Sequence, residues 1–221
     1  GSSWKYGSSA DVLGAVIEAA AGMSFGEYLK KSFFEPLGMK DTGFFVPEEK
    51  RERLVTVYRA DEKNGLVPYR EDHLGIFNAM DHKPAFESGG AGLVSTADDY
   101  ARFAQMLLNG GELDGVRILK PRTVRYMTQG ALNETQKEAF VKNFPNMPGF
   151  DYGNLVRVMK DTGRSCTLNN AGEYGWDGWL GCYFANDPAA DMTILFMMQR
   201  TDSGLTPLAR RLRNVIMSEQ D

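Results

Sequence analysis

Near the N-terminus, apolar residues recur with a helical period. In residues 11–21 they share one face, and Gly22 follows as a stop signal, which predicts a helix. That face consists of Val12, Leu13, Val16, Ile17 and Ala20. Ser24, with Glu27 three residues later, forms a capping-box pattern and predicts a second helix that ends near Pro36.

Residues 40–90 show no sustained period and contain Pro47, Pro68 and Pro84. This pattern predicts long ordered loops with short strands, which often form functional walls in compact domains. Beyond them, Ser95-Thr96-Ala97-Asp98 matches another capping box, so a helix is expected to begin here and to end at Asn109-Gly110-Gly111. Pro121, at a first helical position, predicts a further helix.

After Pro148 the pattern changes to β-rich runs at 155–159, 179–185 and 193–198, with a turn at Asn186-Asp187-Pro188. A terminal amphipathic helix is marked by Leu205, Leu208, Leu212, Val215 and Ile216. Helices followed by consecutive antiparallel strands and a closing helix predict an α+β fold. We expect residues 1–147 and 148–221 to be two parts of one domain.

Composition narrows the function classes. With 43% apolar and 24% charged residues, the chain of 221 residues can bury a sizeable core. The net charge of −4 and the scattered basic residues argue against nucleic-acid binding. The short basic stretch at residues 210–213 is expected to be a solvated helix face. No apolar stretch approaches the ~18 residues of a membrane span.

The two cysteines, Cys166 and Cys182, permit at most one internal disulfide. They lie symmetrically about Tyr174, so they would be cross-strand neighbours if Tyr174 were a hairpin tip. The simpler interpretation is two buried thiols that act as small hydrophobes. The cysteine content is compatible with a periplasmic or extracellular location and with a cytoplasmic one.

Several motifs together resemble one enzyme family. They are Tyr6-Gly7-Ser8, Phe34-Glu35-Pro36-Leu37-Gly38-Met39, Gly89-Gly90-Ala91-Gly92-Leu93-Val94-Ser95-Thr96-Ala97-Asp98-Asp99, Leu107-Leu108-Asn109-Gly110-Gly111, Gly175-Trp176-Asp177-Gly178 and Asp187-Pro188. The chain is similar to the serine β-lactamase and penicillin-binding-protein superfamily. It resembles most closely the class C-like branch, which includes carboxylesterases and D-amino-acid peptidases.

The resemblance implies a role for Tyr6 and for Ser8. Tyr6 matches the tyrosine that carries protons between the nucleophile and the leaving group. A phenol needs an adjacent cation to act as a base near neutrality, and the family supplies a lysine for this. Ser8 stands where lactamase-like members carry Asn, and a hydroxyl cannot offer the donor and acceptor pair of an amide. A helix-capping role for Ser8 or Ser9 is an equal alternative.

The third motif would bind substrate through Trp176, Asp177 and Gly178. Trp176 stands where a Lys or His is usual, and an indole supplies no positive charge for a carboxylate. The resemblance therefore implies neutral ester or amide substrates. Gly178 fits a place where substrate approaches the strand backbone closely. The backbone N–H of Trp179 would be one of two oxyanion-hole donors.

The first motif, Ser-x-x-Lys, has one literal match, at Ser2-Ser3-Trp4-Lys5. A working motif needs its serine at a buried helix N-terminus, and no helix is expected at a chain end directly before Tyr6. The nucleophile is therefore expected on an upstream segment. Lys160-Asp161-Thr162-Gly163 resembles Lys-Thr-Gly with an inserted Asp, and it is interpreted as a hairpin turn.

The other candidate residues have structural explanations that need no catalytic or metal-binding role. His73 and His82 each follow an aspartate, but their spacing fits no compact zinc pattern, so loop histidines beside a cleft are favoured and no metal is expected. Asp98 and Asp99 suit the first turn of a helix. Five aromatic residues of the loops would wall the cleft or simply pack in the core. They are Phe44, Phe45, Tyr58, Tyr69 and Phe77.

The leading hypothesis is part of a serine hydrolase that forms an acyl-enzyme on esters, small amides or peptides, inactive without the upstream segment. Its partners would be that segment and a small ester, amide or lactam substrate, with no cofactor. One alternative is a β-lactamase or D-amino-acid peptidase of the same superfamily. Another is a non-catalytic, penicillin-binding-like sensor. A purely structural fragment would instead show an exposed apolar face.

Overall fold

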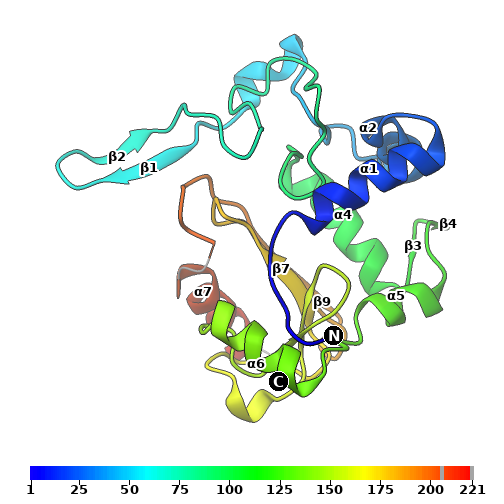
Figure 1. Ribbon diagram of the computed structural model, residues 1–221, viewed down its shortest axis with the longest axis vertical. Coiled ribbons are helices and arrows are strands. Elements are labelled where there is room, and N and C mark those ends of the chain that lie inside the picture. Colours follow the sequence, from blue (N-terminus) through cyan, green and yellow to red (C-terminus); the bar gives the residue numbers. More distant parts are fainter. Residues whose placement is uncertain (205–206, 220–221) are drawn as a thin grey trace.

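The main sheet has five antiparallel strands in the order β5-β6-β7-β8-β9, in a computed structural model that describes residues 1–204 and 207–219. Its strands are β5 (Phe150–Tyr152), β6 (Arg157–Met159), β7 (Tyr174–Asp177), β8 (Tyr183–Asp187) and β9 (Met192–Phe196). Helices precede the sheet and α7 (Pro207–Ser218) closes it, so the predicted α+β fold is confirmed (Figure 1). The division between residues 147 and 148 stays a prediction.

The N-terminal helices follow their local signals. Helix α1 (Ser9–Ala21) ends at Gly22, whose φ of 64° is the left-handed cap that glycine favours. Ser24 and Glu27 form the predicted capping box of α2 (Phe25–Leu29). The helix continues through a π-helical turn, η1 (Lys30–Phe34), into α3 (Glu35–Leu37).

Helix α4 (Ala97–Leu108) has its N-cap at Thr96, one residue later than the capping-box pattern predicted. The Thr96 hydroxyl accepts a hydrogen bond from the Asp99 amide at 3.2 Å. Ser95 does not cap the helix; its hydroxyl lies 2.8 Å from that of Thr42. The predicted helix at Pro121 is α5 (Pro121–Met127).

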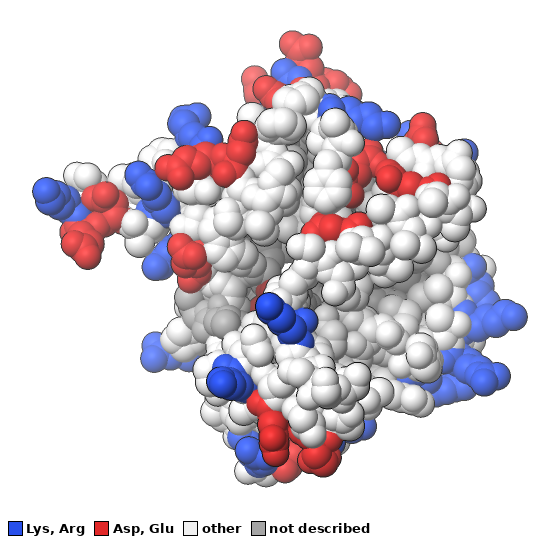
Figure 2. Space-filling model, in the orientation of Figure 1, with Lys and Arg blue, Asp and Glu red and all other residues white. Residues whose placement is uncertain are grey.

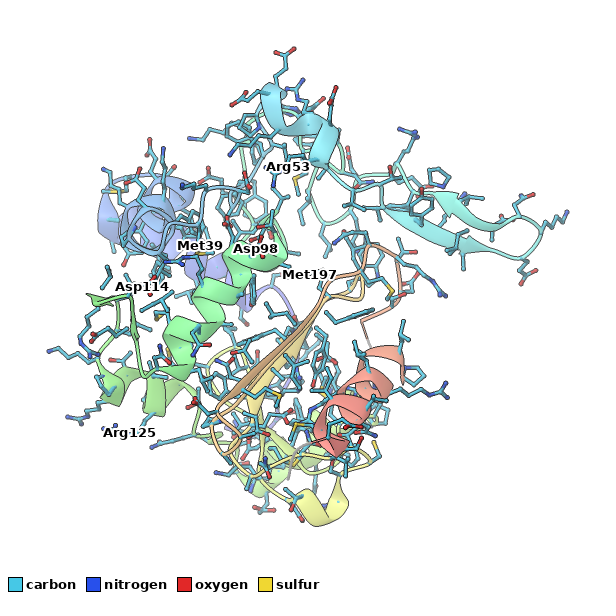
Figure 3. The ribbon with its side chains drawn as sticks, turned by 180° about the vertical axis from the view of Figure 1, so that it is seen from behind. Met39, Arg53, Asp98, Asp114, Arg125 and Met197 are labelled. Atoms are coloured by element: carbon cyan, nitrogen blue, oxygen red, sulfur yellow. The ribbon has the colours of Figure 1, made fainter. Side chains whose placement is uncertain are left out.

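Helices cover both faces of the sheet. On one face, Ala104, Met106 and Leu107 of α4 share a buried cluster with Val158 and Phe184 of the strands. On the other face, Ala209, Ile216 and Met217 of α7 pack against buried residues of β8 and β9. Figure 3, which views the molecule from behind, shows α4 and Met39 on one side of the strands and α7 on the other. The sheet is therefore the centre of the fold, and it holds the residues at the ends of its strands in fixed positions.

Buried charges dock α7 onto the sheet. Arg213 is only 1% exposed and forms ion pairs with Glu173 and Asp187. The prediction of a solvated basic face is therefore wrong for Arg213, and also for Arg210, whose side chain is 12% exposed and pairs with Asp177. Leu208, Leu212 and Val215, which were expected to be on the apolar face, are exposed, and only Ile216 of that set packs against the sheet. Leu205 lies outside the described residues.

The loop region contains short elements, as predicted. It holds η2 (Glu48–Arg53) and an antiparallel hairpin of β1 (Tyr58–Asp61) and β2 (Gly65–Pro68), which projects from the body in Figure 1. The Tyr58 amide donates to the Gln199 carbonyl at 2.9 Å, and the Thr201 amide donates to the Tyr58 carbonyl at 2.8 Å. These bonds anchor the hairpin beside the end of β9.

Some elements differ from the prediction. Helix α6 (Glu134–Asn143), the small β3–β4 hairpin (Glu112–Leu113 and Val116–Arg117) and strand β5 were not predicted. The run at 179–185 becomes strand only from Tyr183, and Trp179 lies in the preceding turn. Asn186 and Asp187 belong to β8, so the turn to β9 comes one to two residues later than predicted.

Both cysteines are free, Cys166 exposed and Cys182 half-buried. Tyr174 lies inside β7, so the predicted hairpin tip is wrong, and so is the interpretation of Cys166 as a buried thiol. Lys160 to Gly163 lead from β6 into a 3₁₀ turn, η3 (Thr162–Arg164).

Helix α1 forms as predicted, but much of its apolar face is uncovered. Val12, Leu13 and Val16 are exposed, and only Gly14 of this helix is buried. Within residues 1–204 and 207–219 no single helix is long and apolar enough to cross a membrane; Ser9–Ala21 and Phe25–Leu37 pass that test only as a pair bent by 77°.

Candidate active site

The two motif positions Tyr6 and Trp176 are in direct contact. Their rings stack with centroids 5.5 Å apart and planes inclined by 25°. Residues 1–6, which include Ser2 and Lys5, have no helix, and they run past β7 toward the start of α1 (Figure 1). The Tyr6 side chain stays 48% exposed. The fold thus brings together motifs that lie 170 positions apart in the sequence.

An aromatic cluster holds this pair in place. Phe144, just after α6, meets both Tyr6 and Trp176 edge-on, with ring centroids 5.6 Å apart in each case. Tyr152 of β5 lies edge-on to Trp176 at 5.3 Å, and Trp4 packs on Tyr152 at 5.1 Å. Such aromatic pairs stabilise one another beyond the area they bury. The cluster could not be predicted from the sequence, because Phe144 follows α6 and Tyr152 lies in β5, two elements that were not predicted.

The cluster is neutral. Burial, and to a smaller extent the neighbouring Tyr6, raise the pKa of Tyr152 to about 12. Tyr152 therefore stays a neutral phenol near pH 7. None of the ring partners of Tyr6, which are Trp4, Phe144 and Trp176, carries a positive charge. In the view of Figure 2, acidic and basic side chains are scattered over the surface, and some basic side chains lie near its centre.

Ser8 is the N-cap residue of α1, but its side chain makes no capping bond. Only its carbonyl takes part, accepting from the Val12 amide at 3.1 Å. Ser9 is already the first helical residue. Capping therefore does not account for the Ser8 hydroxyl, which is exposed two residues beyond Tyr6.

Gly178 and Trp179 follow Trp176 at the end of β7. The Gly178 amide donates to the Cys182 carbonyl at 2.7 Å, and the Gly178 carbonyl accepts from the Gly181 amide at 2.9 Å, which closes the β7–β8 turn. A Cβ on Gly178 would meet only ordinary contacts, the nearest at 3.5 Å from Cys182. Packing within the described residues therefore does not demand a glycine here. By contrast, a Cβ on Gly175 would lie 1.9 Å from the Phe184 carbonyl.

The Trp179 backbone N–H makes no hydrogen bond with any described residue, while its carbonyl accepts from the Ser203 amide at 3.0 Å. Its indole N–H donates to Asp202 at 2.9 Å. The His73 ring stacks on the indole with centroids 4.3 Å apart, and Tyr69 meets it edge-on at 6.1 Å. Two residues of the loop region thus pack on Trp179, which follows the third motif. Trp179 nevertheless stays 39% exposed.

Asp177 has a structural environment. Its side chain is 4% exposed and lies 2.6 Å from Arg157 and 3.1 Å from Arg210 of α7. Arg157 is itself buried between the rings of Phe150 and Tyr183. Because each oxygen of the carboxylate is paired with an arginine, this geometry does not direct Asp177 toward a substrate.

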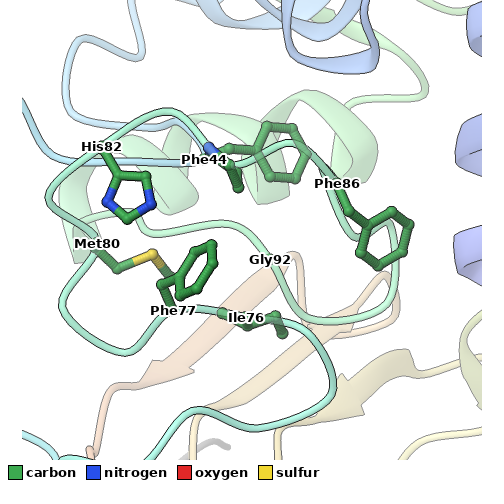
Figure 4. Close-up of a pocket in the computed structure, with 8 residues that line it drawn as sticks. Phe44, Ile76, Phe77, Met80, His82, Phe86 and Gly92 are labelled. Carbon is green, nitrogen blue, oxygen red and sulfur yellow. The ribbon is translucent and has the colours of Figure 1, made fainter.

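The other candidates lie apart from this pair. His82 is 2.6 Å from Asp81, and it lines a small apolar pocket with a cavity volume of about 10 Å³, close to the space one water needs. Figure 4 shows its lining, which consists of Phe44, Ile76, Phe77, Met80, His82, Pro84, Phe86 and Gly92. Across the described chain, no group of three His, Cys, Asp or Glu residues is arranged to hold a metal ion. Asp99 accepts bonds from the Asp41 amide and the Thr42 hydroxyl, which is a structural role.

Residues 1–216 match the family model described as Beta-lactamase, so the chain belongs to this family. Protein Rv1367c of Mycobacterium tuberculosis is 35% identical over 197 residues, which cover 88% of this chain and 48% of that protein. Esterase EstB of Burkholderia gladioli is 28% identical over 234 residues, covering 98% of this chain and 55% of that protein. The predicted membership of the serine β-lactamase and penicillin-binding-protein superfamily is confirmed.

A solved structure agrees with the fold. EstCE1, described as a hydrolase with promiscuous acyltransferase activity, superposes with a TM-score of 0.82 at 25% identity, covering 98% of this chain and 56% of that one. The chain therefore spans about half the length of the proteins it matches.

Proposed function

We propose that this chain is the part of a serine hydrolase that supplies the proton-transferring tyrosine and one oxyanion donor. The stacked contact between Tyr6 and Trp176 carries the proposal, because it unites the tyrosine motif with the Trp-x-Gly motif. The similarity to an esterase and to a hydrolase with acyltransferase activity favours acyl transfer as the reaction class. The substrates would be neutral esters, small amides or peptides.

In the proposed reaction a serine hydroxyl of an upstream segment attacks the substrate carbonyl. The side-chain oxygen of Tyr6 acts as the general base and accepts the serine proton while the new C–O bond forms. Tyr6 then gives that proton to the leaving alkoxide or amine as its bond to the carbonyl carbon breaks. Water hydrolyses the resulting acyl-enzyme by the same proton route in reverse, releasing the acid and restoring the serine.

Trp179 would stabilise the negative charge that develops on the carbonyl oxygen. Its backbone N–H has no acceptor among the described residues, and it sits in a turn fixed by bonds of Gly178 and Ser203. A donor of this kind typically contributes ~10²–10³ in kcat. The packing around Gly178 does not require a glycine at this position. The missing side chain would instead allow the substrate to approach the strand backbone.

Substrate charge would be set by the aromatic character of the site. Trp176 offers an apolar face and one N–H donor, and its ring partners Tyr6, Phe144 and Tyr152 are neutral. A substrate carboxylate that binds here would lose its hydration, and none of these rings carries a positive charge that could compensate for that loss. This favours neutral substrates over the carboxylate-bearing β-lactams.

The serine and its lysine would lie on a segment that packs against the exposed apolar face of α1. Exposed apolar patches of this kind mark interaction sites. The fact that this chain spans about half of its matched relatives supports such a segment. We expect the isolated chain to show no turnover, since loss of the nucleophile costs ~10⁶ in kcat in triad-type sites.

The test uses the full-length protein that contains this chain. A fluorophosphonate should add one label per molecule, located by peptide mass analysis outside residues 1–221, and should abolish hydrolysis of p-nitrophenyl acetate. Tyr6→Phe should lower kcat by about 10²–10⁴ with a small change in KM. Labelling inside residues 1–221, or normal turnover by Tyr6→Phe, would contradict the proposal. Stable acylation by a fluorescent penicillin without turnover would favour the sensor instead.

A further inference from the structure

A strained turn projects a leucine beside the candidate site. The His73 and Ile76 backbones exchange two hydrogen bonds, at 3.2 and 2.9 Å, and enclose Leu74 and Gly75. Both enclosed residues have positive φ, 53° and 75°, as a type I′ turn requires. Glycine, asparagine and aspartate suit these positions, whereas leucine is disfavoured by its Cβ. Leu74 is nevertheless here, and it is 71% exposed.

The base of this loop imposes the strained conformation. The Asn78 amide donates to the Asp72 carboxylate at 3.0 Å, and the Asn78 side chain donates to the Tyr69 carbonyl at 2.7 Å. The Tyr69 amide in turn donates to the Val57 carbonyl at 2.7 Å. Backbone strain of this sort persists where surrounding bonds fix it, and it gathers at functional sites.

The turn lies between Trp179 and Phe86. On one side, the His73 ring stacks on Trp179, whose N–H is the proposed oxyanion donor. On the other side, a Cβ on Gly75 would lie 3.7 Å from the Phe86 ring, so the turn passes close to Phe86 (Figure 4).

The chain beyond Phe86 is bound to the first turn of α1. The Ser88 hydroxyl donates to the Asp11 carboxylate at 2.6 Å, and the Gly90 amide donates to the same carboxylate oxygen at 3.0 Å. Helix α1 begins just after the tyrosine motif. Leu74 therefore stands between the segment that bears Trp179 and the segment tied to the start of α1.

We propose that Leu74 is a specificity-determining residue that contacts an apolar chain of the ester substrate. This inference rests on the proposed function. Trp179 and Phe86, which flank the turn, are also partly exposed, so a bound chain would bury three apolar side chains that otherwise face water. The chain could belong to the acyl or to the alcohol half of the ester, and the experiment separates the two.

The full-length protein is assayed with two ester series. One lengthens the acyl group from acetate to octanoate on a constant p-nitrophenol, and the other lengthens the alcohol of an acetate. Leu74→Asn keeps a residue that tolerates positive φ but removes the apolar side chain. We expect it to lower the ratio of kcat/KM for the longest ester to kcat/KM for the shortest ester by about tenfold in one of the two series, the low end of what one methylene contact in an apolar pocket supplies.

Stability provides the internal check. Because Asn relieves strain at this position, the thermal midpoint of Leu74→Asn should equal or exceed that of the parent. Leu66→Asn, which changes another exposed leucine, 57% exposed and in the projecting hairpin, is the control and should leave both ratios unchanged. Unchanged ratios in Leu74→Asn, or equal losses of kcat/KM on short and long esters, would overturn the role of Leu74 but not the proposed function. A full-length protein that hydrolyses neither esters nor small amides or peptides would overturn the proposed function.

Discussion

The rings of Tyr6 and Trp176 stack at 5.5 Å, although 170 positions separate them in the sequence. Tyr6 comes from the extended segment before α1, and Trp176 comes from the centre of the main sheet. Phe144 and Tyr152 surround the pair, so the tyrosine is held by neutral rings. Under the proposed function, this neutral environment would favour a substrate without a charge.

Trp176→Lys should therefore redirect the full-length protein toward substrates that bear a carboxylate. At about 4 Å and an effective dielectric constant of 20, opposite charges attract by roughly 4 kcal/mol before screening and desolvation. We expect a net gain of at least about tenfold in the rate of labelling by a fluorescent penicillin relative to neutral ester hydrolysis. Trp176→Leu controls for loss of the ring. If Leu and Lys give the same ratio, charge at this position does not select the substrate.

Asp177 should matter for stability more than for substrate contact. Asp177→Asn removes the charge that compensates Arg157, which is 1% exposed. Breaking one side of a buried ion pair typically costs about 3–5 kcal/mol. Urea unfolding should show a loss of this order. Asp191→Asn is the control, because Asp191 is an exposed turn residue with a φ of 48° that asparagine tolerates. A large fall in kcat/KM with unchanged stability would instead place Asp177 against the substrate.

Local signals predicted the helices well. Gly22 at the end of α1 and the capping box of α2 act within a few positions, and the structure has both where the sequence indicated. Helix α6 was missed although Asn133 and Gln136 form a full capping box, because Phe140 is the only buried residue on a mostly polar helix.

Long-range partners could not be predicted in the same way. Arg213 is buried because Glu173 and Asp187 reach it from the sheet, and nothing near Arg213 in the sequence reveals this. The stacking of His73 on Trp179 has the same origin, since it depends on how the loop folds back onto the sheet. Motif resemblance supplied Tyr6 and Trp176, but the aromatic cluster around them required the fold.

His73 should act by positioning Trp179. Its ring covers the indole while Asp202 holds the indole N–H, so the peptide that carries the proposed oxyanion donor is fixed from two sides. His73→Ala should lower kcat of the full-length protein by about two- to tenfold, the range expected for one aromatic pair, with little change in KM. His73→Phe preserves a stacking ring and should recover most of the activity. Equal losses in both variants would show that stacking is not the relevant property.

Asp41 should make stability depend on acid pH. Hydrogen bonds from Arg53 and Lys50, at 2.8 and 2.7 Å, lower the pKa of Asp41 to about 2. Figure 3 shows Arg53 on the side of the molecule where α4 begins, near Asp98. When a carboxyl has a lower pKa in the folded state than in the unfolded state, its charge stabilises the folded protein at every pH above the unfolded-state pKa. This contribution is lost as the pH falls toward the folded-state pKa.

The expected contribution of Asp41 is about 1 kcal/mol at pH 7, because the partly exposed partners weaken the pairs through solvent screening. Urea unfolding of the parent and of Asp41→Asn should differ by this amount at pH 6, and the difference should shrink steadily toward pH 2.5. Titration of the Asp41 carboxyl by NMR should show a midpoint near 2. A difference that stays constant over this pH range would mean that Asp41 stabilises the loop through hydrogen bonds that do not depend on its charge.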